Sequence, residues 1–166
     1  MRSYIRLFQP GGCYFFTVVT GKRAPHFSDD VTVERLKQAF RHVIIMHPFT
    51  IDAIVVMPDH LHAVWSLPDG DSDFSTRWRL IKHFVSRGAD GNAPFWQPRF
   101  WEHLIRDEAD YQQHIDYIHY NPVKHGFVTR PEEWHHSSYH KAMELGLYPA
   151  GWGHIEPNSC RELELE

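Results

Sequence analysis

The sequence has few cysteines and no long hydrophobic run, and both absences narrow its class. Cys13 and Cys160 are the only cysteines and lie far apart, which argues against a disulfide framework or a cysteine zinc site. The longest apolar runs, such as residues 43–46 and 54–57, fall far short of the roughly 20 residues that a membrane-spanning helix needs. The N-terminus lacks the apolar core of a secretory signal. We therefore expect a cytoplasmic protein with reduced thiols.

Strong net charge is also absent. The 166 residues carry a formal net charge of -4 with a pI near 6.4, which argues mildly against a protein that coats duplex DNA non-specifically. The charge is unevenly distributed, because acidic residues gather late in the chain at Glu132, Glu133, Glu162, Glu164 and Glu166. Basic residues cluster within a short central stretch at Arg77, Arg79, Lys82 and Arg87. A basic strip can therefore exist on a mildly acidic protein.

Hydrophobic patterning predicts one domain of alternating strands and helices. Strands are predicted at residues 13–20, 49–57, 61–67 and 99–105. Helices are predicted at residues 31–46, from a cap at Ser72 or Asp73 to about Arg87, at 107–121 ended by Pro122, and at 134–145. This order is typical of an α+β fold, with a ferredoxin-like or RRM-like antiparallel sheet and helices packed mainly on one face. We place the domain at residues 1–150 and an irregular tail at 151–166.

Two histidines one residue apart interrupt an apolar run in the third predicted strand. Because side chains alternate along a strand, His60 and His62 point to one face and Leu61 to the other. Two imidazoles on one rigid face can share a metal ion. The chain has 14 histidines, however, so close pairs also arise by chance, and two ligands rarely complete a coordination sphere. A metal site here needs a third ligand and a chemical partner.

The predicted helix at residues 107–121 supplies a candidate partner. At ~100° per residue, one flank of this helix carries Asp110, His114, Tyr117 and Asn121. A tyrosine beside a two-histidine metal site indicates phosphoryl transfer, in which the phenolate attacks a phosphodiester and becomes a covalent phosphotyrosine. Taken alone, a tyrosine in this position is more commonly an ordinary half-buried residue. No general base can be assigned from the sequence, and His114 and Lys124 are candidate helpers.

Three sequence blocks resemble a known family in order and spacing. They are MPDHLHAVW at residues 57–65, FWQPRFWEHLIRD at residues 95–107 and HIDYIHYNPVKHGFV at residues 114–128. Together they resemble the HUH single-tyrosine transposases, and within these the REP-associated tyrosine transposase (RAYT) group. The similarity extends from GGCYFFTVV at residue 11 to about GLYPAGW, which ends at residue 152. It therefore covers most of the chain and implies the HUH endonuclease fold.

The resemblance implies a site and a reaction. His60 and His62 match the metal-binding histidines, Tyr117 matches the nucleophile, and Asn121 occupies the place of a polar third ligand. The implied ion is Mg²⁺ or Mn²⁺, although imidazole ligands also suit Zn²⁺. The implied enzyme cleaves single-stranded DNA at hairpins of repetitive extragenic palindromes (REP), leaving a 5′-phosphotyrosine and a 3′-hydroxyl. It can rejoin strands without ATP.

DNA binding and assembly follow from the same resemblance. Hairpin contacts are expected from the basic residues Arg77, Arg79, Lys82, Arg87, Arg99 and Lys124. The tryptophans Trp65, Trp96 and Trp101 could stack on unpaired bases or fill the core. The resemblance to the RAYT group favours a monomer at the bacterial nucleoid, with a homodimer as the alternative and no membrane partner.

Two other functions stay open: a hairpin-binding regulator that does not cleave and, ranked last, a small metal hydrolase unrelated to nucleic acid.

Overall fold

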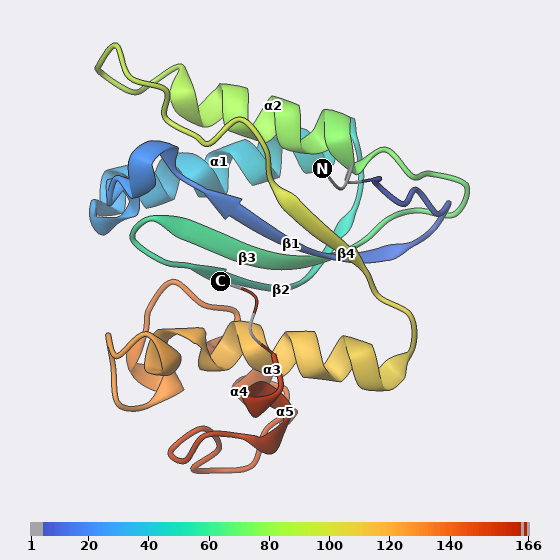
Figure 1. Ribbon diagram of the computed structural model, residues 1–166, viewed down its shortest axis with the longest axis vertical. Coiled ribbons are helices and arrows are strands. Elements are labelled where there is room, and N and C mark those ends of the chain that lie inside the picture. Colours follow the sequence, from blue (N-terminus) through green and yellow to red (C-terminus); the bar gives the residue numbers. More distant parts are fainter. Residues whose placement is uncertain (1–4, 164, 166) are drawn as a thin grey trace.

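A four-stranded antiparallel sheet forms the centre of the protein (Figure 1). The computed structural model describes residues 5–163 and 165. Glu164 and Glu166 of the acidic tail lie outside the described residues. The strands are β1 (Cys13–Val19), β2 (Thr50–Val56), β3 (His60–Ser66) and β4 (Trp101–Leu104), in the sheet order β2-β3-β1-β4. The predicted α+β class with an antiparallel sheet is confirmed.

Five α-helices accompany the strands within the described residues: α1 (Asp30–Met46), α2 (Phe74–Ser86), α3 (Glu108–Lys124), α4 (Tyr139–Glu144) and α5 (Asn158–Arg161). Short 3₁₀ turns lie at Gly21–Arg23, His26–Ser28 and Pro131–Glu133. The three long helices each begin after an aspartate whose carboxylate accepts hydrogen bonds from backbone N–H groups of the first turn. Asp73 rather than Ser72 caps α2, accepting from the N–H of Thr76 at 2.9 Å. None of the helices in this part of the chain is long and apolar enough to cross a bilayer.

The helices cover both faces of the sheet, so the prediction that they pack mainly on one face was wrong (Figure 1). Helices α1 and α2 pack on one face together with Tyr14, Phe16 and Trp65. Helix α3 packs on the other face, where Phe15 and Val64 lie. The physical reason is that β1 and β3 are central strands that carry buried side chains on both faces. One of these two buried faces also carries the histidines.

Helix α3 continues through Pro122 instead of ending before it, which corrects the predicted boundary. A proline removes its own N–H from the helical ladder, and its ring crowds the carbonyl four residues earlier. The following turn is still hydrogen bonded, since the N–H of His125 donates to the carbonyl of Asn121 at 3.0 Å. The helix predicted at 134–145 is also shorter and is confined to α4. Within the predicted tail, α5 forms around the buried Cys160, while the domain boundary at residue 150 stays a prediction.

A tight connection between β2 and β3 sets where the histidines lie, as the sequence predicted. The two strands pair antiparallel, and Pro58 and Asp59 form the turn between them. The N–H of Met57 donates to the carbonyl of His60 at 2.8 Å, which closes this turn. His60 is consequently the first residue of a central strand whose neighbour is β1.

Candidate active site

The two histidines of β3 lie side by side on the sheet face that α3 covers. The ring centroids of His60 and His62 are 4.9 Å apart, and the ring planes are inclined by 74°. Leu61 belongs to the core on the opposite face. The prediction that both imidazoles share a face is confirmed, while metal binding stays a prediction.

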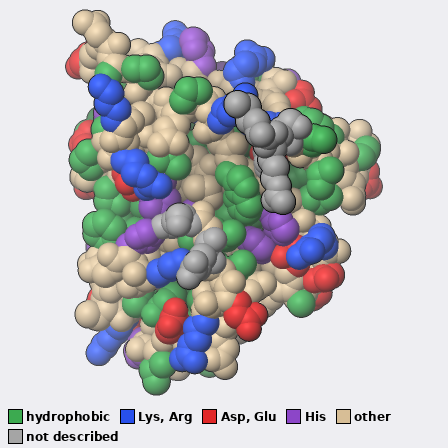
Figure 2. All heavy atoms as spheres, in the orientation of Figure 1, with side chains coloured by type: hydrophobic (Ala, Val, Ile, Leu, Met, Phe, Trp, Pro, Cys, Tyr) green, Lys and Arg blue, Asp and Glu red, His purple; other side chains and the backbone are tan. Residues whose placement is uncertain are grey.

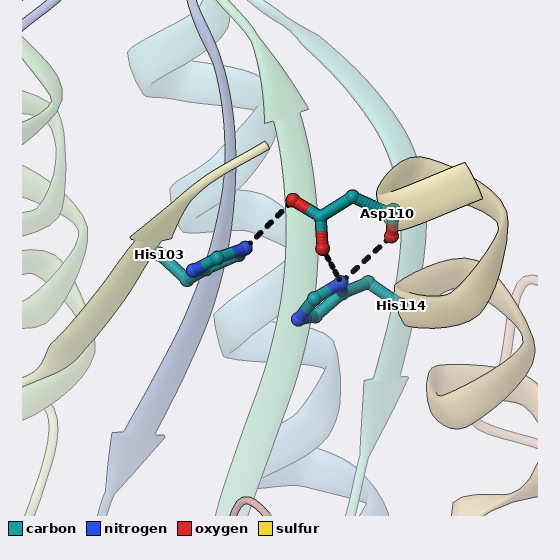
Figure 3. Close-up of side chains that lie close together, drawn as sticks. All are labelled: His103, Asp110 and His114. Carbon is teal, nitrogen blue, oxygen red and sulfur yellow. Dashed lines mark hydrogen bonds and ion pairs between the residues drawn. The ribbon is translucent and has the colours of Figure 1, made fainter. Parts of the chain in front are cut away.

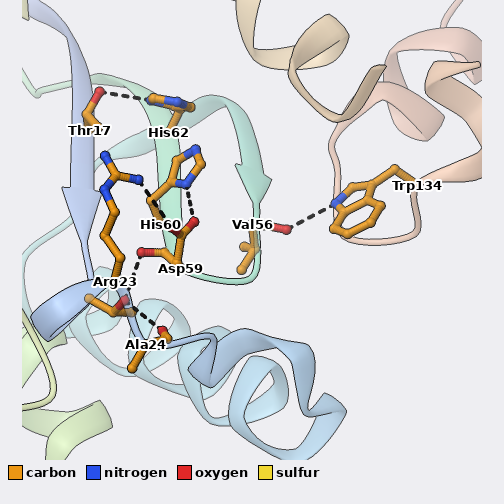
Figure 4. Close-up of polar contacts among 9 residues, drawn as sticks. Thr17, Arg23, Ala24, Val56, Asp59, His60, His62 and Trp134 are labelled. Carbon is orange, nitrogen blue, oxygen red and sulfur yellow. Dashed lines mark hydrogen bonds and ion pairs between the residues drawn. The ribbon is translucent and has the colours of Figure 1, made fainter. Parts of the chain in front are cut away.

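Each imidazole is oriented by one neighbouring side chain (Figure 4). Thr17 pairs with His62 across β1 and β3, and its hydroxyl lies 2.9 Å from Nδ1 of His62. A carboxylate oxygen of Asp59 lies 2.7 Å from Nδ1 of His60. Histidine metal ligands are commonly oriented in this way, through hydrogen bonding at the ring nitrogen that does not bind the metal. Nε2 is therefore the nitrogen of each ring that would hold an ion.

Asp59 is itself held by a second partner. The guanidinium of Arg23 lies 3.1 Å from the other carboxylate oxygen of Asp59, and the backbone of Arg23 is left-handed with φ 53°. Partial burial acts to raise the pKa of Asp59, but the hydrogen bonds and electrostatic attraction of His60 and Arg23 outweigh it and hold that pKa below its ordinary value. Asp59 therefore remains a carboxylate that accepts the Nδ1–H of His60.

Tyr117 projects from α3 toward these histidines. Its ring centroid lies 5.4 Å from that of His62, and its side chain is only 1% exposed. The ammonium of Lys124 lies 3.5 Å from the Tyr117 hydroxyl and 4.6 Å from the ring centroid. A cation in this position favours the anionic form of a phenol. The structure thus brings the predicted nucleophile to the predicted metal ligands and places a positive charge beside it.

Asn121 follows Tyr117 by one helical turn, so both side chains leave the same side of α3. It is completely buried. An amide oxygen is a hard ligand, and imidazoles suit several divalent ions. Together with His60 and His62, this donor set fits a divalent ion that keeps open positions for phosphate oxygens. The assignment of Asn121 as third ligand stays a prediction.

The C-terminal segment lies against the Tyr117 side of this site. Leu163 and Leu165 pack against the apolar cluster that contains Tyr117. The ammonium of Lys124 also donates to the carbonyl of Leu163 at 3.4 Å. The C-terminal segment therefore shares Lys124 with the Tyr117 hydroxyl.

The two candidate helpers occupy different positions. Lys124 reaches the Tyr117 hydroxyl, whereas the contacts of His114 include hydrogen bonds to Asp110 at the start of α3. Burial lowers the pKa of His114, which favours a neutral imidazole. Lys124 is consequently the better placed of the two to assist Tyr117.

The basic residues predicted on the central helix lie on the far side of the sheet from the histidines, because α2 covers the opposite face. Arg79 and Arg87 are exposed there, as is Arg99 in the loop before β4. Arg77 is buried and donates to Asp71 and to three backbone carbonyls. We therefore remove Arg77 from the expected DNA contacts, because its donors are used inside the protein. The partly buried Lys82 donates to the carbonyl of Gln97 at 2.9 Å.

The three tryptophans considered for base stacking also differ in exposure. Trp65 is completely buried and stacks on Trp78, with ring centroids 4.3 Å apart, so it fills the core. Trp96 is nearly buried and donates from its ring to the carbonyl of Lys82 at 3.1 Å. Trp101 at the start of β4 is 38% exposed. Of the three, Trp101 presents the largest surface to a base.

Sequence reasoning missed the residues that orient the histidines. Asp59 adjoins His60, and that adjacency was an available signal. Thr17 could be found only by knowing that β1 pairs with β3 in this register. Arg23 reaches Asp59 from a turn with unusual backbone geometry, for which the sequence offers no signal.

Comparison with known proteins identifies the family. A family described as "Transposase IS200 like" matches residues 11–121. A REP-associated tyrosine transposase of Escherichia coli strain K12 is 46% identical over 156 residues, covering 92% of this chain and 91% of the relative. A Haemophilus influenzae protein, given the same name provisionally, is 36% identical over 166 residues and covers 92% of this chain and 94% of its own.

A solved structure extends the likeness to the whole fold. It is described as a REP-associated tyrosine transposase bound to a REP hairpin, and it matches with a TM-score of 0.84 and 40% identity over 99% of both chains. The three resembling blocks, the antiparallel sheet and the facing histidine and tyrosine elements all agree with this relationship. The chain is thus a member of the IS200-like, HUH single-tyrosine transposase family and belongs to its REP-associated group.

Proposed function

We propose that this protein is a metal-dependent single-stranded DNA endonuclease and strand transferase that acts on REP hairpin DNA. The observation that carries the proposal is that Tyr117 faces His62, with ring centroids 5.4 Å apart, while Lys124 lies at the tyrosine hydroxyl. Family membership supports the reaction class, and a related protein of known structure is bound to a REP hairpin.

The proposed reaction exchanges one ester for another. His60, His62 and Asn121 would hold a divalent ion, Mg²⁺ or Mn²⁺, which when bound polarises the phosphate oxygens. The Tyr117 hydroxyl gives its proton to solvent, and its oxygen forms a bond to the scissile phosphorus as the bond from phosphorus to the 3′-oxygen breaks. The departing 3′-oxygen takes up a proton, so the products are a 3′-hydroxyl and a 5′-phosphotyrosine. Attack by a 3′-hydroxyl on that ester rejoins DNA without ATP.

Lys124 assists the attack by electrostatics. A phenol ordinarily ionises near pH ~10, so the phenolate is scarce at neutral pH. An ammonium 3.5 Å from the Tyr117 oxygen stabilises the negative charge that develops there. His62 remains oriented during this step because Thr17 holds its Nδ1.

Substrate binding would use exposed cations and one aromatic ring. On the face shown in Figure 2, histidine side chains gather near the middle, with Lys and Arg side chains around them. Arg99 in the loop before β4 is exposed and available to phosphates, and Trp101 offers a stacking surface. Arg79 and Arg87 are exposed on α2, across the sheet from the histidines, so they would contact DNA away from the scissile phosphate. The histidines and Tyr117 meet within one chain, which supports a monomer acting in cis. We propose the bacterial nucleoid as its location because its substrate would be DNA.

The test is formation of a covalent adduct. The protein is incubated with Mn²⁺ and a REP hairpin that carries single-stranded flanks and a label at its 3′ end, the end that stays with a 5′-phosphotyrosine, and the products are separated under denaturing conditions. We expect a labelled protein band with the wild type and none with Tyr117→Phe. Tyr120→Phe, a matched change on the same helix, should retain the adduct. An equal adduct from Tyr117→Phe would show that another residue is the nucleophile.

One observation favours the non-cleaving hairpin-binding regulator as a second candidate. Tyr117 is 1% exposed, so a phosphodiester reaches the hydroxyl only after the side chains around it move. A regulator predicts tight hairpin binding with no metal-stimulated cleavage on any substrate tested. Binding and cleavage measured on one set of hairpins separate the two functions.

A further inference from the structure

A second cluster of potential metal ligands lies between β4 and the start of α3 (Figure 3). His103 comes from β4, and Asp110 and His114 lie one turn apart on α3. Nε2 of His103 lies 2.8 Å from one carboxylate oxygen of Asp110, and Nδ1 of His114 lies 3.2 Å from the other. The two imidazoles are stacked, with centroids 4.7 Å apart and planes inclined by 18°. A carboxylate is thus shared by two histidines from different elements.

The spacing of these groups suits a metal ion. One nitrogen from each imidazole and one carboxylate oxygen all lie within 4.8 Å of one another. Ligands bound to Zn²⁺ at ~2.0–2.2 Å in a tetrahedron are separated by about 3.3–3.6 Å, so binding would draw these groups closer and turn the stacked rings until one nitrogen of each faces the ion. Nδ1 of His114 also lies 2.8 Å from the carbonyl of Asp110, which can only accept. That hydrogen bond places the proton on Nδ1 and leaves the lone pair on Nε2.

The surroundings restrain the ligands but admit an ion. Trp101 stacks on His103 on one side of the cluster, and Phe15 contacts His114 on the other. The His103 side chain is 24% exposed, which gives access from solvent. The guanidinium of Arg106 brings a positive charge to the cluster, with its Nε 3.6 Å from a carboxylate oxygen of Asp110. The Arg106 side chain is 74% exposed and can turn into water, while its backbone N–H continues to orient the carboxylate.

We propose that His103, Asp110 and His114 form a second metal site, selective for a borderline transition-metal ion such as Zn²⁺. Two imidazoles and one carboxylate match the preference of such ions for nitrogen ligands with an oxygen ligand, and water would complete the coordination. Coordination through Nε2 of His103 replaces its hydrogen bond to Asp110, and the ring proton moves to Nδ1. The ion would join β4 to the helix that carries Tyr117, and the proposal does not depend on the activity proposed above.

The test is metal stoichiometry in the full chain. Co²⁺ serves as a visible-absorbing probe and Zn²⁺ as the ion for calorimetry. In the His60→Ala/His62→Ala double variant, which removes the first pair of ligands, we expect one bound ion to remain. Adding His103→Ala should abolish this binding, whereas adding His83→Ala, an exposed histidine on α2, should leave it unchanged. Circular dichroism checks that each variant is folded.

A substitution that supplies a different metal ligand at position 103 distinguishes loss of the site from loss of folding. His103→Cys in the same double variant should restore one Co²⁺ and add a thiolate-to-cobalt charge-transfer band in the near ultraviolet. The site is overturned if the double variant binds no ion, because the cluster is then a hydrogen-bonded triad only. It is equally overturned if the bound ion survives His103→Ala, or if the cysteine variant binds Co²⁺ without the charge-transfer band.

Discussion

Replacing Arg77 tests whether this residue serves the fold or the DNA. Its guanidinium makes a two-pronged ion pair with Asp71 at 2.8 and 3.0 Å and donates to the carbonyls of His47, Pro48 and Asp73. The Arg77 side chain is 3% exposed, so the carbonyls that lose its N–H donors in a variant are shielded from water. The Asp71 side chain is 34% exposed and can be solvated, so the main loss is at the three carbonyls, each of which costs about 1–3 kcal/mol when buried without a donor. We expect Arg77→Gln to lower the free energy of unfolding by about 3 kcal/mol.

Urea denaturation measures this effect, and Arg79→Gln on the exposed side of the same helix is the matched control. With a urea slope of about 1–3 kcal/mol per molar, Arg77→Gln should lower the midpoint by at least about 1 M with little change in slope. Arg79→Gln should change stability by no more than about 0.5 kcal/mol. Similar midpoints for the two variants would refute the structural role of Arg77.

Acid adds an independent check on the same ion pair. The hydrogen bonds from Arg77 hold the pKa of Asp71 below its ordinary value. A carboxyl with a lowered folded-state pKa contributes stability above its unfolded pKa of ~3.9, and this contribution is lost as the pH falls through the folded pKa. The stability gap between wild type and Arg77→Gln should therefore narrow below pH ~4. A constant gap between pH 7 and pH 3 would contradict this interpretation.

For DNA binding, the change at Arg79 should have the larger effect. If Arg79 contacts a phosphate, Arg79→Gln lowers the magnitude of the slope of log binding constant against log salt concentration by about 0.7–0.9. Arg77→Gln should leave that slope unchanged at temperatures where the variant is folded. A smaller salt dependence for Arg77→Gln, with none for Arg79→Gln, would show that Arg77 contacts the DNA.

Three further changes address the site. Thr17→Val removes the hydroxyl beside Nδ1 of His62, and we expect Mn²⁺ affinity measured by calorimetry to fall about 10–100-fold with little loss of stability. Lys124→Met should move the pH profile of adduct formation by Tyr117 to higher pH, while Lys124→Arg should restore it, and an unchanged profile would remove Lys124 from the mechanism. Trp101→Ala should weaken binding to single-stranded flanks by about 1–3 kcal/mol in a titration at fixed salt, and equal affinity would exclude stacking there.

The elements carrying the site could be predicted because their patterns are local. Alternation along β3 placed His60 and His62 on one face, and the helical period placed Tyr117 and Asn121 on one flank of α3. The end of α3 was predicted wrongly, since Pro122 costs the helix one N–H without preventing the next turn. Each of these inferences needed only neighbouring residues.

Other features depend on contacts between distant segments. The helical period puts Arg77 on the apolar face of α2 and Arg79 away from it, but only the approach of Asp71 and the segment after α1 shows what pairs with a charged group on that face. The helices cover both faces because β1 and β3 are central strands, and strand order is a property of the whole sheet. Thr17 becomes a partner of His62 through the register of those two strands. None of these could be read from a single segment.

Phe15 illustrates how such packing joins the site to its surroundings. Its ring stacks on His62 with centroids 5.3 Å apart, and it also contacts the rings of Tyr117 and His114. The side chain is fully buried, so its sequence environment is that of any core aromatic residue. Because interiors are close-packed, a change in the volume of this ring would move the histidine, the tyrosine and the His103 cluster together. The distance between metal ligand and nucleophile is therefore set partly by a residue that carries no chemistry of its own.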